Sequence, residues 1–466
     1  MLIFMRTISY YNMRILAFLS KDIFNYPSTK PLCLARKFSS SISSQQISLP
    51  SSIQQEKLLK PQFTQSFHYQ PKPLTLSQIQ SLLDQYPIIN QIPADFFESI
   101  EQNIHESLKN YNKDTDTKIL SKILTIYLKL GQKNLSFLEP AQKIIFQNLS
   151  QLNFKDAHIL YTLCVGQRNL GIQDMIDYVQ KPYLKEIVER FDKTDILSIS
   201  VALAQYANNR EFYGIYVSND IKEKVFQGLS GSRNLNLGNS FNKIKTYYNL
   251  LYFAYISGIL NENIAMQACN NLIQTLYFFT LEDFLKFGAI FSSFNTIPIK
   301  FWMSFFSCTI NLHSYSSTSL KYLFVLIMTR LKVSEPRIQT QIFKSLNFEV
   351  QEWLLNFKGN KKIKINSENN EETDFIIELL KSKKLDVVLN LDDGVLIDFA
   401  VPNKRLAYLL CDPGKSIWPE GTPDGEFSDR CFILTKKHWK VRIIYPHPKS
   451  SFKDRLYGLI KQDLST

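Results

Sequence analysis

The chain has 466 residues, which is long enough for two or three domains. Apolar residues make up 45% of it, and that share argues against an intrinsically disordered protein. The 54 Lys and Arg residues outnumber the 42 Asp and Glu residues and give a net charge of +12, which favours a polyanionic partner. The six cysteines are scattered without a CxxC pair, so neither a zinc site nor a disulfide framework is predicted.

The first 44 residues have the composition of an organellar presequence. They carry several basic residues but only one acid, Asp22, and they are rich in Ser, Leu, Ile and Tyr. The segment Arg36–Ser40 resembles the cleavage region of a matrix peptidase. Residues 1–44 are therefore predicted to be a mitochondrial presequence that directs the protein to the matrix; the alternative is an N-terminus without a targeting role. The polar residues 45–73 are predicted to be a disordered leader.

Residues 74–357 contain repeated amphipathic helical patterns. In Leu120–Leu128, for example, apolar residues recur with the spacing of one helix face. Polar residues that can cap a helix precede several of these patterns, at 114–117, 155–156, 193–195 and 281–283. Gly or Asn ends the first helix of each predicted pair at intervals of roughly 40 residues, at Gly131, Gly171, Asn208, Gly258 and Asn295. We therefore expect an α-solenoid of about six helix pairs, with an irregular helical bundle as the alternative.

Solenoids of this period bind peptides or single-stranded RNA along their inner helices. Thr117 and Thr194, near predicted helix starts, could contact bases, but helix capping explains them equally well. Apolar runs such as residues 247–260 and 322–329 are shorter than the about 20 residues that a membrane span requires, so no span is predicted.

A different pattern begins after the charged, Asn-rich linker predicted at residues 358–373. One more helix, at 374–381, leads into three short apolar runs at 385–391, 395–401 and 405–412, separated by turn sequences, which predict three strands. A loop rich in Pro and Gly, a helix at 428–438, a strand at 439–446 and a closing helix at 453–464 follow. Residues 374–466 are therefore predicted to form a small α/β domain.

These C-terminal residues resemble the RAP domain, a module found mostly in organellar RNA-metabolism proteins. The resemblance covers roughly the last fifth of the chain and rests on Asp398 in an apolar strand, a next strand that ends in Asp412, the loop Gly421-Thr422, a helix with Arg430 and Leu434, and the strand from Trp439 to Pro446. It implies a restriction-endonuclease-like fold and a role with RNA. The fold predicted for the whole chain is thus mostly α, with solenoid-like helical repeats followed by a small α/β RAP domain.

Cleavage of RNA on such a fold needs two acids that hold Mg²⁺ and a lysine that activates the attacking water. Asp398 fits the first position of the endonuclease pattern. Leu410 stands where many RAP domains have Glu, and Asp412 stands where the lysine is expected, although Lys404 or Lys415 could substitute from loops. We therefore predict no catalytic residue, no metal site and no cofactor, and we expect Asp398 and Asp412 to cap turns or orient basic groups.

Binding is the chemistry that the domain favours, because cations neutralise phosphates and aromatic rings stack on unpaired bases. The predicted RNA-binding residues are Lys404, Arg405, Lys415, Trp418, Arg430, Lys436, Lys437, Lys440 and Arg442. His438 and Trp439 lie among them, although Trp439 is also expected in the core. Three acids, Asp424, Glu426 and Asp429, are expected to dilute the positive charge.

The sequence thus predicts a mitochondrial RNA-binding protein that does not cleave RNA. It would act in the processing, stability or translation of organellar mRNA, or in rRNA maturation. One alternative is a structural subunit of a divergent mitochondrial ribosome. A second alternative is a metal-dependent endoribonuclease that uses Asp398 and Asp412.

Overall fold

The computed structural model of the chain describes residues 75–84, 94–109, 116–129, 137–167, 170–210, 213–230, 240–309, 318–356, 371–382, 385–393, 395–411, 413–445 and 457–462. All of these residues belong to one compact unit, Gln70–Thr466. The predicted presequence and leader lie outside the described residues, and so does the predicted linker apart from residues 371–373.

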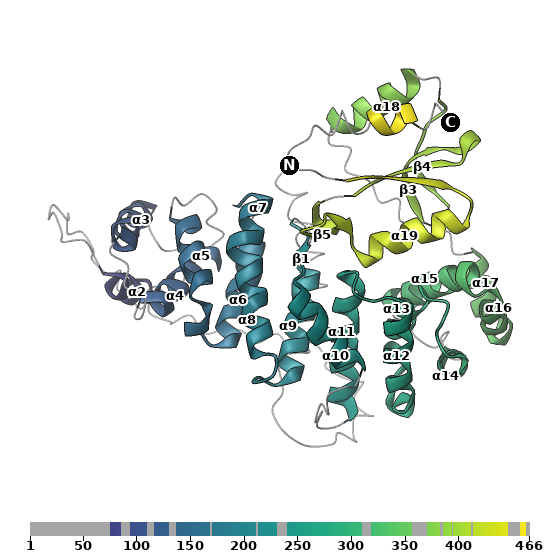
Figure 1. Cartoon of the computed structure of the whole chain (residues 1–466), viewed down its shortest axis with the longest axis horizontal. Coiled ribbons are helices and arrows are strands. Elements are labelled where there is room, and N and C mark those ends of the chain that lie inside the picture. Colours follow the sequence, from purple (N-terminus) through teal and green to yellow (C-terminus); the bar gives the residue numbers. More distant parts are fainter. Residues whose placement is uncertain are drawn as a thin grey trace, which may run out of the picture. The chain divides into compact units, whose positions relative to one another are not determined.

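The described part of the chain is mostly helical, with a small sheet-containing C-terminal region, as the sequence predicted (Figure 1). The helices are α2 (Leu76–Asp84), α3 (Ala94–Lys109), α4 (Asp116–Lys129), α5 (Leu138–Gln147), α6 (Phe154–Val165), α7 (Ile172–Met175), α8 (Lys181–Arg190), α9 (Ile196–Asn208), α10 (Asn219–Ser230), α11 (Ser240–Ile256), α12 (Glu262–Ile273), α13 (Leu281–Phe291), α14 (Ile299–Thr309), α15 (Thr318–Ser334), α16 (Pro336–Ser345), α17 (Phe348–Asn356), α18 (Glu371–Ser382) and α19 (Gly425–Lys436). The strands are β1 (Ile215–Tyr216), β2 (Val388–Asp392), β3 (Leu396–Val401), β4 (Leu406–Leu410), β5 (Ser416–Trp418), β6 (Thr422–Pro423) and β7 (Lys440–Ile444). A π-helical turn, η3 (Ile176–Gln180), joins α7 to α8.

Side-chain caps fix where several of these helices begin. Asp195 accepts a hydrogen bond from the backbone of Leu197 at the start of α9, at a position that the sequence predicted. Thr280 and Asp283 form a reciprocal capping box at the start of α13. Helix α6 begins after Asn153, two residues earlier than predicted, because the Asn153 side chain accepts from the first turn. Each such cap contributes about 1 kcal/mol to helix stability.

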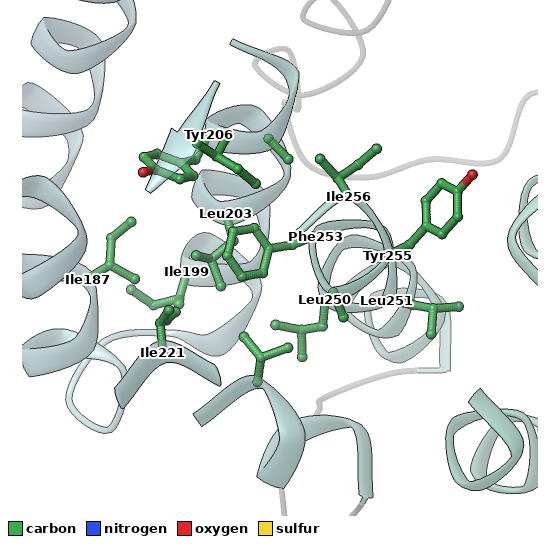
Figure 2. Packing of buried hydrophobic residues seen from close by; sticks show 14 of the residues in the cluster. Ile187, Ile199, Leu203, Tyr206, Ile221, Leu250, Leu251, Phe253, Tyr255 and Ile256 are labelled. Atoms are coloured by element: carbon green, nitrogen blue, oxygen red, sulfur yellow. The ribbon is translucent and has the colours of Figure 1, made fainter. Parts of the chain in front are cut away.

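The helices from α4 to α16, apart from the short α7, contact one another in two series. In one series α4, α6, α9, α11, α13 and α15 each pack against the next; in the other α5, α8, α10, α12, α14 and α16 do so. Between them lies a continuous apolar core, and Figure 2 shows Ile199 and Leu203 of α9 meeting Phe253 of α11 there. The same view shows the ring of Tyr255 pointing away from that cluster. Among the described residues no helix combines the length and apolarity that crossing a membrane requires.

The C-terminal region contains a four-stranded sheet in the order β2-β3-β4-β7. β2, β3 and β4 are antiparallel neighbours, whereas β7 runs parallel to β4, with Leu406 opposite Lys440. The parallel pair requires a crossover, which α19 supplies. Helix α19 begins three residues before the predicted helix because the Asp424 side chain caps it, and Trp439 lies in the turn before β7 rather than in the strand.

Both faces of this sheet are covered, because successive side chains of β4 point to opposite faces and are apolar on both. Ala407 and Leu409 of β4 point into one apolar cluster with α19, whereas Leu406 and Tyr408 belong to a second cluster with Leu380 of α18 and the helical residues 457–462. The predicted α/β organisation therefore places β4 between two apolar layers.

A second, smaller sheet joins the helical region to the C-terminal region. Strand β1, between α9 and α10, pairs in parallel with β5, which pairs with β6. Ile215 lies opposite Ile417, and the Val217 N–H donates to the Trp418 carbonyl at 3.1 Å. No strand was predicted in the helical region, since β1 has only two residues and its ladder depends on β5.

Candidate nucleic-acid interface

Exposed cations gather where β4 and β7 begin. The turn Pro402–Lys404 ends at Arg405, whose φ of 52° is left-handed, and β4 starts at the next residue. Because β4 and β7 are parallel, their first residues are neighbours, and the Lys440 N–H donates to the Arg405 carbonyl at 2.7 Å. Lys404, Arg405 and Lys440 are all exposed. These three residues are called the β4–β7 cluster below.

Trp439 supports this cluster from underneath. Its side chain is 5% exposed, and its indole N–H donates to Oδ2 of Asp393 at 2.7 Å. The Arg405 guanidinium lies over the ring, 5.3 Å from its centroid. The expectation that Trp439 belongs to the core is therefore confirmed, and the cation above it is held over an aromatic face. His438, next to it in the chain, is exposed.

Three of the predicted RNA-binding cations form ion pairs with carboxylates of the same domain. Lys415 contacts Glu426 at 2.6 Å, Arg430 contacts Asp398 at 2.9 Å, and Lys437 contacts Asp393 at 3.0 Å. Burial works against ionisation of Asp393, but the hydrogen bond from Trp439 and the charge of Lys437 outweigh it and lower the pKa of Asp393. These three cations are thus partly neutralised.

Two further predicted cations differ in exposure. Lys436, in the last turn of α19, is exposed, and its ammonium lies 5.4 Å from the centre of the Phe432 ring. Arg442, on β7, is half-buried. The exposed cations of the prediction are therefore Lys404, Arg405, Lys436 and Lys440.

Trp418 does not lie on the surface that the sequence predicted for it. Its side chain is only 9% exposed, and its indole N–H donates to the Tyr213 carbonyl of the helical region at 2.8 Å. The Trp418 ring is thus used in packing β5 against residues 213–217, and the prediction that it stacks on a base is corrected.

Asp398 holds a basic group, as expected. Its Oδ2 accepts from the Leu410 N–H at 2.8 Å and its Oδ1 faces Nη2 of Arg430 at 2.9 Å. The Arg430 Nε donates to the Leu396 carbonyl at 2.6 Å, which fixes the guanidinium. Asp412 lies outside the described residues. Within the described ranges, no three His, Cys, Asp or Glu side chains are grouped so that they could hold a metal ion.

The acids at the start of α19 face the helical region instead of the β4–β7 cluster. Arg210, after α9, donates from Nε to Asp424 at 2.7 Å and from Nη2 to Glu426 at 2.5 Å. Arg330 of α15 lies 2.8 Å from Asp429. Asp429 also accepts hydrogen bonds from the hydroxyl groups of Tyr255 and Ser293. The predicted dilution of the basic surface therefore applies to Lys415, which contacts Glu426 at 2.6 Å, whereas none of these acids forms an ion pair with Lys404 or Arg405.

Burial raises the pKa of a carboxyl group and nearby positive charge lowers it, and the balance differs among these three acids. Burial raises the pKa of Asp424 and of Asp429 above the ordinary value. Burial also works against ionisation of Glu426, but the positive charges of Arg210 and Lys415 outweigh it, so the pKa of Glu426 is lowered. Sequence reasoning missed Arg210 because nothing in its local pattern marks a partner 214 positions away.

No protein-family model matches the chain, and no curated protein matches it. The resemblance to RAP domains therefore rests on the C-terminal residues and their order alone.

Proposed function

We propose that this protein is an RNA-binding protein of the mitochondrial matrix and that its C-terminal region is a RAP domain that holds RNA without cleaving it. The observation that supports RNA binding most is the division of charge in this region. Asp424 and Asp429 are turned toward arginines of the helical region, while Lys404, Arg405 and Lys440 face solvent. A polyanion that approaches the β4–β7 cluster thus meets exposed cations, and Asp393, whose charge interacts with Arg405, is already paired with Lys437.

The chemistry of the cluster suits a phosphodiester backbone. Neither Lys404 nor Arg405 forms an ion pair within the described part of the chain. Exposed ammonium and guanidinium groups release condensed counterions when they contact phosphates, which supplies most of the sequence-independent affinity for RNA. A guanidinium held over Trp439 keeps its N–H groups available for phosphate oxygens.

The environment of Asp398 favours RNA binding over RNA cleavage. A carboxylate that binds Mg²⁺ must offer its oxygens to the metal. Here one oxygen accepts from the Leu410 N–H and the other faces Arg430, whose positive charge repels a divalent cation. Leu410 also supplies no carboxylate at the neighbouring position.

We also propose that the helix pairs form an α-solenoid. The two series of helix contacts, one through α4, α6, α9, α11, α13 and α15 and the other through α5 to α16, support this architecture.

Fluorescence anisotropy with labelled poly(U) of about 20 nucleotides tests RNA binding. The readouts are the affinity and the salt slope, which is the steepness with which the logarithm of the binding constant falls with the logarithm of the salt concentration. We expect the triple variant Lys404→Gln, Arg405→Gln, Lys440→Gln to bind about tenfold more weakly and to lower the slope by about 2, at about 0.7 per lost phosphate contact. The matched control is Lys185→Gln, Lys300→Gln, Lys332→Gln, three exposed lysines of the helical region. Equal binding by both triple variants would contradict the role of the cluster.

The location and the ribosomal alternative are tested in cells. Residues 1–44 fused to a fluorescent protein should direct it to mitochondria, and replacing the basic residues of this segment by Ala should abolish import. Stable co-sedimentation of the endogenous protein with assembled mitochondrial ribosomes would favour the structural-subunit alternative over a transient factor.

A further inference from the structure

A groove of about 600 Å³ lies on the helical region, far along the chain from the β4–β7 cluster. It is formed by α2, by one face of α4 and by the segment that leads into α6. We propose that this groove is a second RNA site, which binds the phosphate backbone of an extended single strand. The proposal rests on the proposed function, since it takes RNA as the ligand.

Three lysines of α4 give the groove its charge. Lys118, Lys122 and Lys129 line it, and all three are exposed. Lys118 and Lys122 are one helical turn apart, and Lys129 lies about two turns further on nearly the same face. None of them forms an ion pair within the described ranges. They therefore present a row of unneutralised ammonium groups along one wall.

The groove also contains one carboxylate, which is already engaged, and a buried amide oxygen that favours the same kind of ligand. Asp156 is the single carboxylate among the lining residues, and it is engaged with the Asn153 side chain at 2.5 Å. The side-chain oxygen of Gln151 is buried and has no hydrogen-bond partner among the described residues. A buried acceptor without a partner is costly, so it favours a ligand that brings an N–H or O–H donor.

RNA matches this combination of cations and an acceptor. Ribose hydroxyl groups and base amines are donors that stand beside each phosphate. Ile126 and Ile159 also line the groove and supply apolar surface against which a base can pack. The groove thus offers cations for phosphates, an acceptor for a donor of the nucleotide and apolar walls for the base.

The test uses the full chain and labelled poly(U) of about 20 nucleotides. We expect the triple variant Lys118→Gln, Lys122→Gln, Lys129→Gln to bind about tenfold more weakly and to lower the salt slope by about 2, while the control triple variant at Lys185, Lys300 and Lys332 stays close to wild type. Crosslinking of 4-thiouridine RNA should label peptides from α4 and from residues 151–159. Circular dichroism checks that both variants are folded.

Failure of the groove site and failure of the proposed function give different results. Wild-type binding that only the β4–β7 variant weakens would overturn the groove and leave the proposed function standing. Absence of RNA binding by the wild-type protein would overturn both. Polyglutamate that displaces RNA from the wild type, and binds the groove variant more weakly, would assign the groove to an acidic peptide and overturn its assignment to RNA.

Discussion

Arg210 and Asp424 form a buried ion pair between the helical region and the C-terminal region, with Nε of the arginine 2.7 Å from Oδ2 of the aspartate. Their side chains are 8% and 0% exposed, respectively. Asp424 is at the same time the N-cap of α19, since it accepts from the Phe427 N–H at 2.8 Å. One carboxylate therefore both starts the crossover helix and joins that helix to Arg210, two residues after the end of α9.

Removing the arginine of this pair should destabilise the protein strongly. In Arg210→Ala, Asp424 remains buried without its cation, which typically costs about 3–5 kcal/mol. Urea unfolding followed by circular dichroism measures the loss. The control is Lys181→Ala, which breaks the half-exposed pair with Asp177 and should cost less than about 1 kcal/mol. Similar losses for the two variants would contradict a structural role of Arg210 in joining the two regions.

Gly425 should not tolerate a side chain. A Cβ there would lie 2.0 Å from the carbonyl oxygen of Tyr255, at the end of α11, and backbone atoms cannot move aside cheaply. Gly425→Ala should therefore cost about 1–3 kcal/mol, as overpacking does. Gly458→Ala is the control, because a Cβ at Gly458 meets no atom within 4 Å. It should be neutral or stabilise by up to about 1 kcal/mol, since Ala is the better helix former. Thermal melts of both variants give the comparison.

The stability difference between the wild type and Glu426→Gln should depend on pH in the acid range. The pKa of Glu426 is lowered below its ordinary value of 4.5, so the folded state binds this proton less readily than the unfolded state. The stabilising contribution is therefore complete above pH 4.5 and is lost as the pH falls through the lowered pKa. Urea unfolding at a series of pH values measures it. A difference that grows with acidity would have the wrong sign.

Asp398→Ala should lower the stability of the fold, and neither the wild type nor the variant should cleave RNA. The substitution leaves the Leu410 N–H without its acceptor and the Arg430 guanidinium without its ion-pair partner, at a cost of about 2–3 kcal/mol. Asp398→Asn keeps the volume and one acceptor oxygen and should lose less. Incubation of wild type and both variants with labelled RNA and Mg²⁺ checks the chemistry. Mg²⁺-dependent cleavage that disappears in Asp398→Ala would establish the endoribonuclease alternative.

The sequence predicted the fold well where the signal was local. Apolar stripes such as Leu120–Leu128 indicated α4, and the capping positions at 193–195 marked the start of α9. Residues 281–283, predicted as a cap, are the first residues of α13, whose cap is Thr280. Short apolar runs between turn residues indicated β2, β3 and β4. These features were predictable because hydrogen bonds and periodicity within a few residues determine them.

The candidate site was predicted less completely. Lys404, Arg405 and Lys440 are exposed together, because two parallel strands bring residues far apart in the chain to one edge. Trp418 was misplaced because its burial depends on Tyr213, a residue of another region. The lysines of α4 stand at helical spacing in the sequence, but nothing local indicates that α2 and the start of α6 form a groove around them.

The sequence by itself indicated most of the helices, the strands β2, β3, β4 and β7, and the excess of positive charge, because each of these depends on neighbouring residues or on simple sums. The short strands β1, β5 and β6 were not predicted, because they depend on pairing between distant segments. Only the tertiary structure decided which charges remain available to a ligand. Arg210 and Arg330 neutralise Asp424 and Asp429 across more than 90 intervening residues, and the choice of partner depends on how the helical region packs against α19 through α11 and α15. A charged side chain can bind a ligand only when the fold leaves it exposed to solvent and does not pair it with an opposite charge.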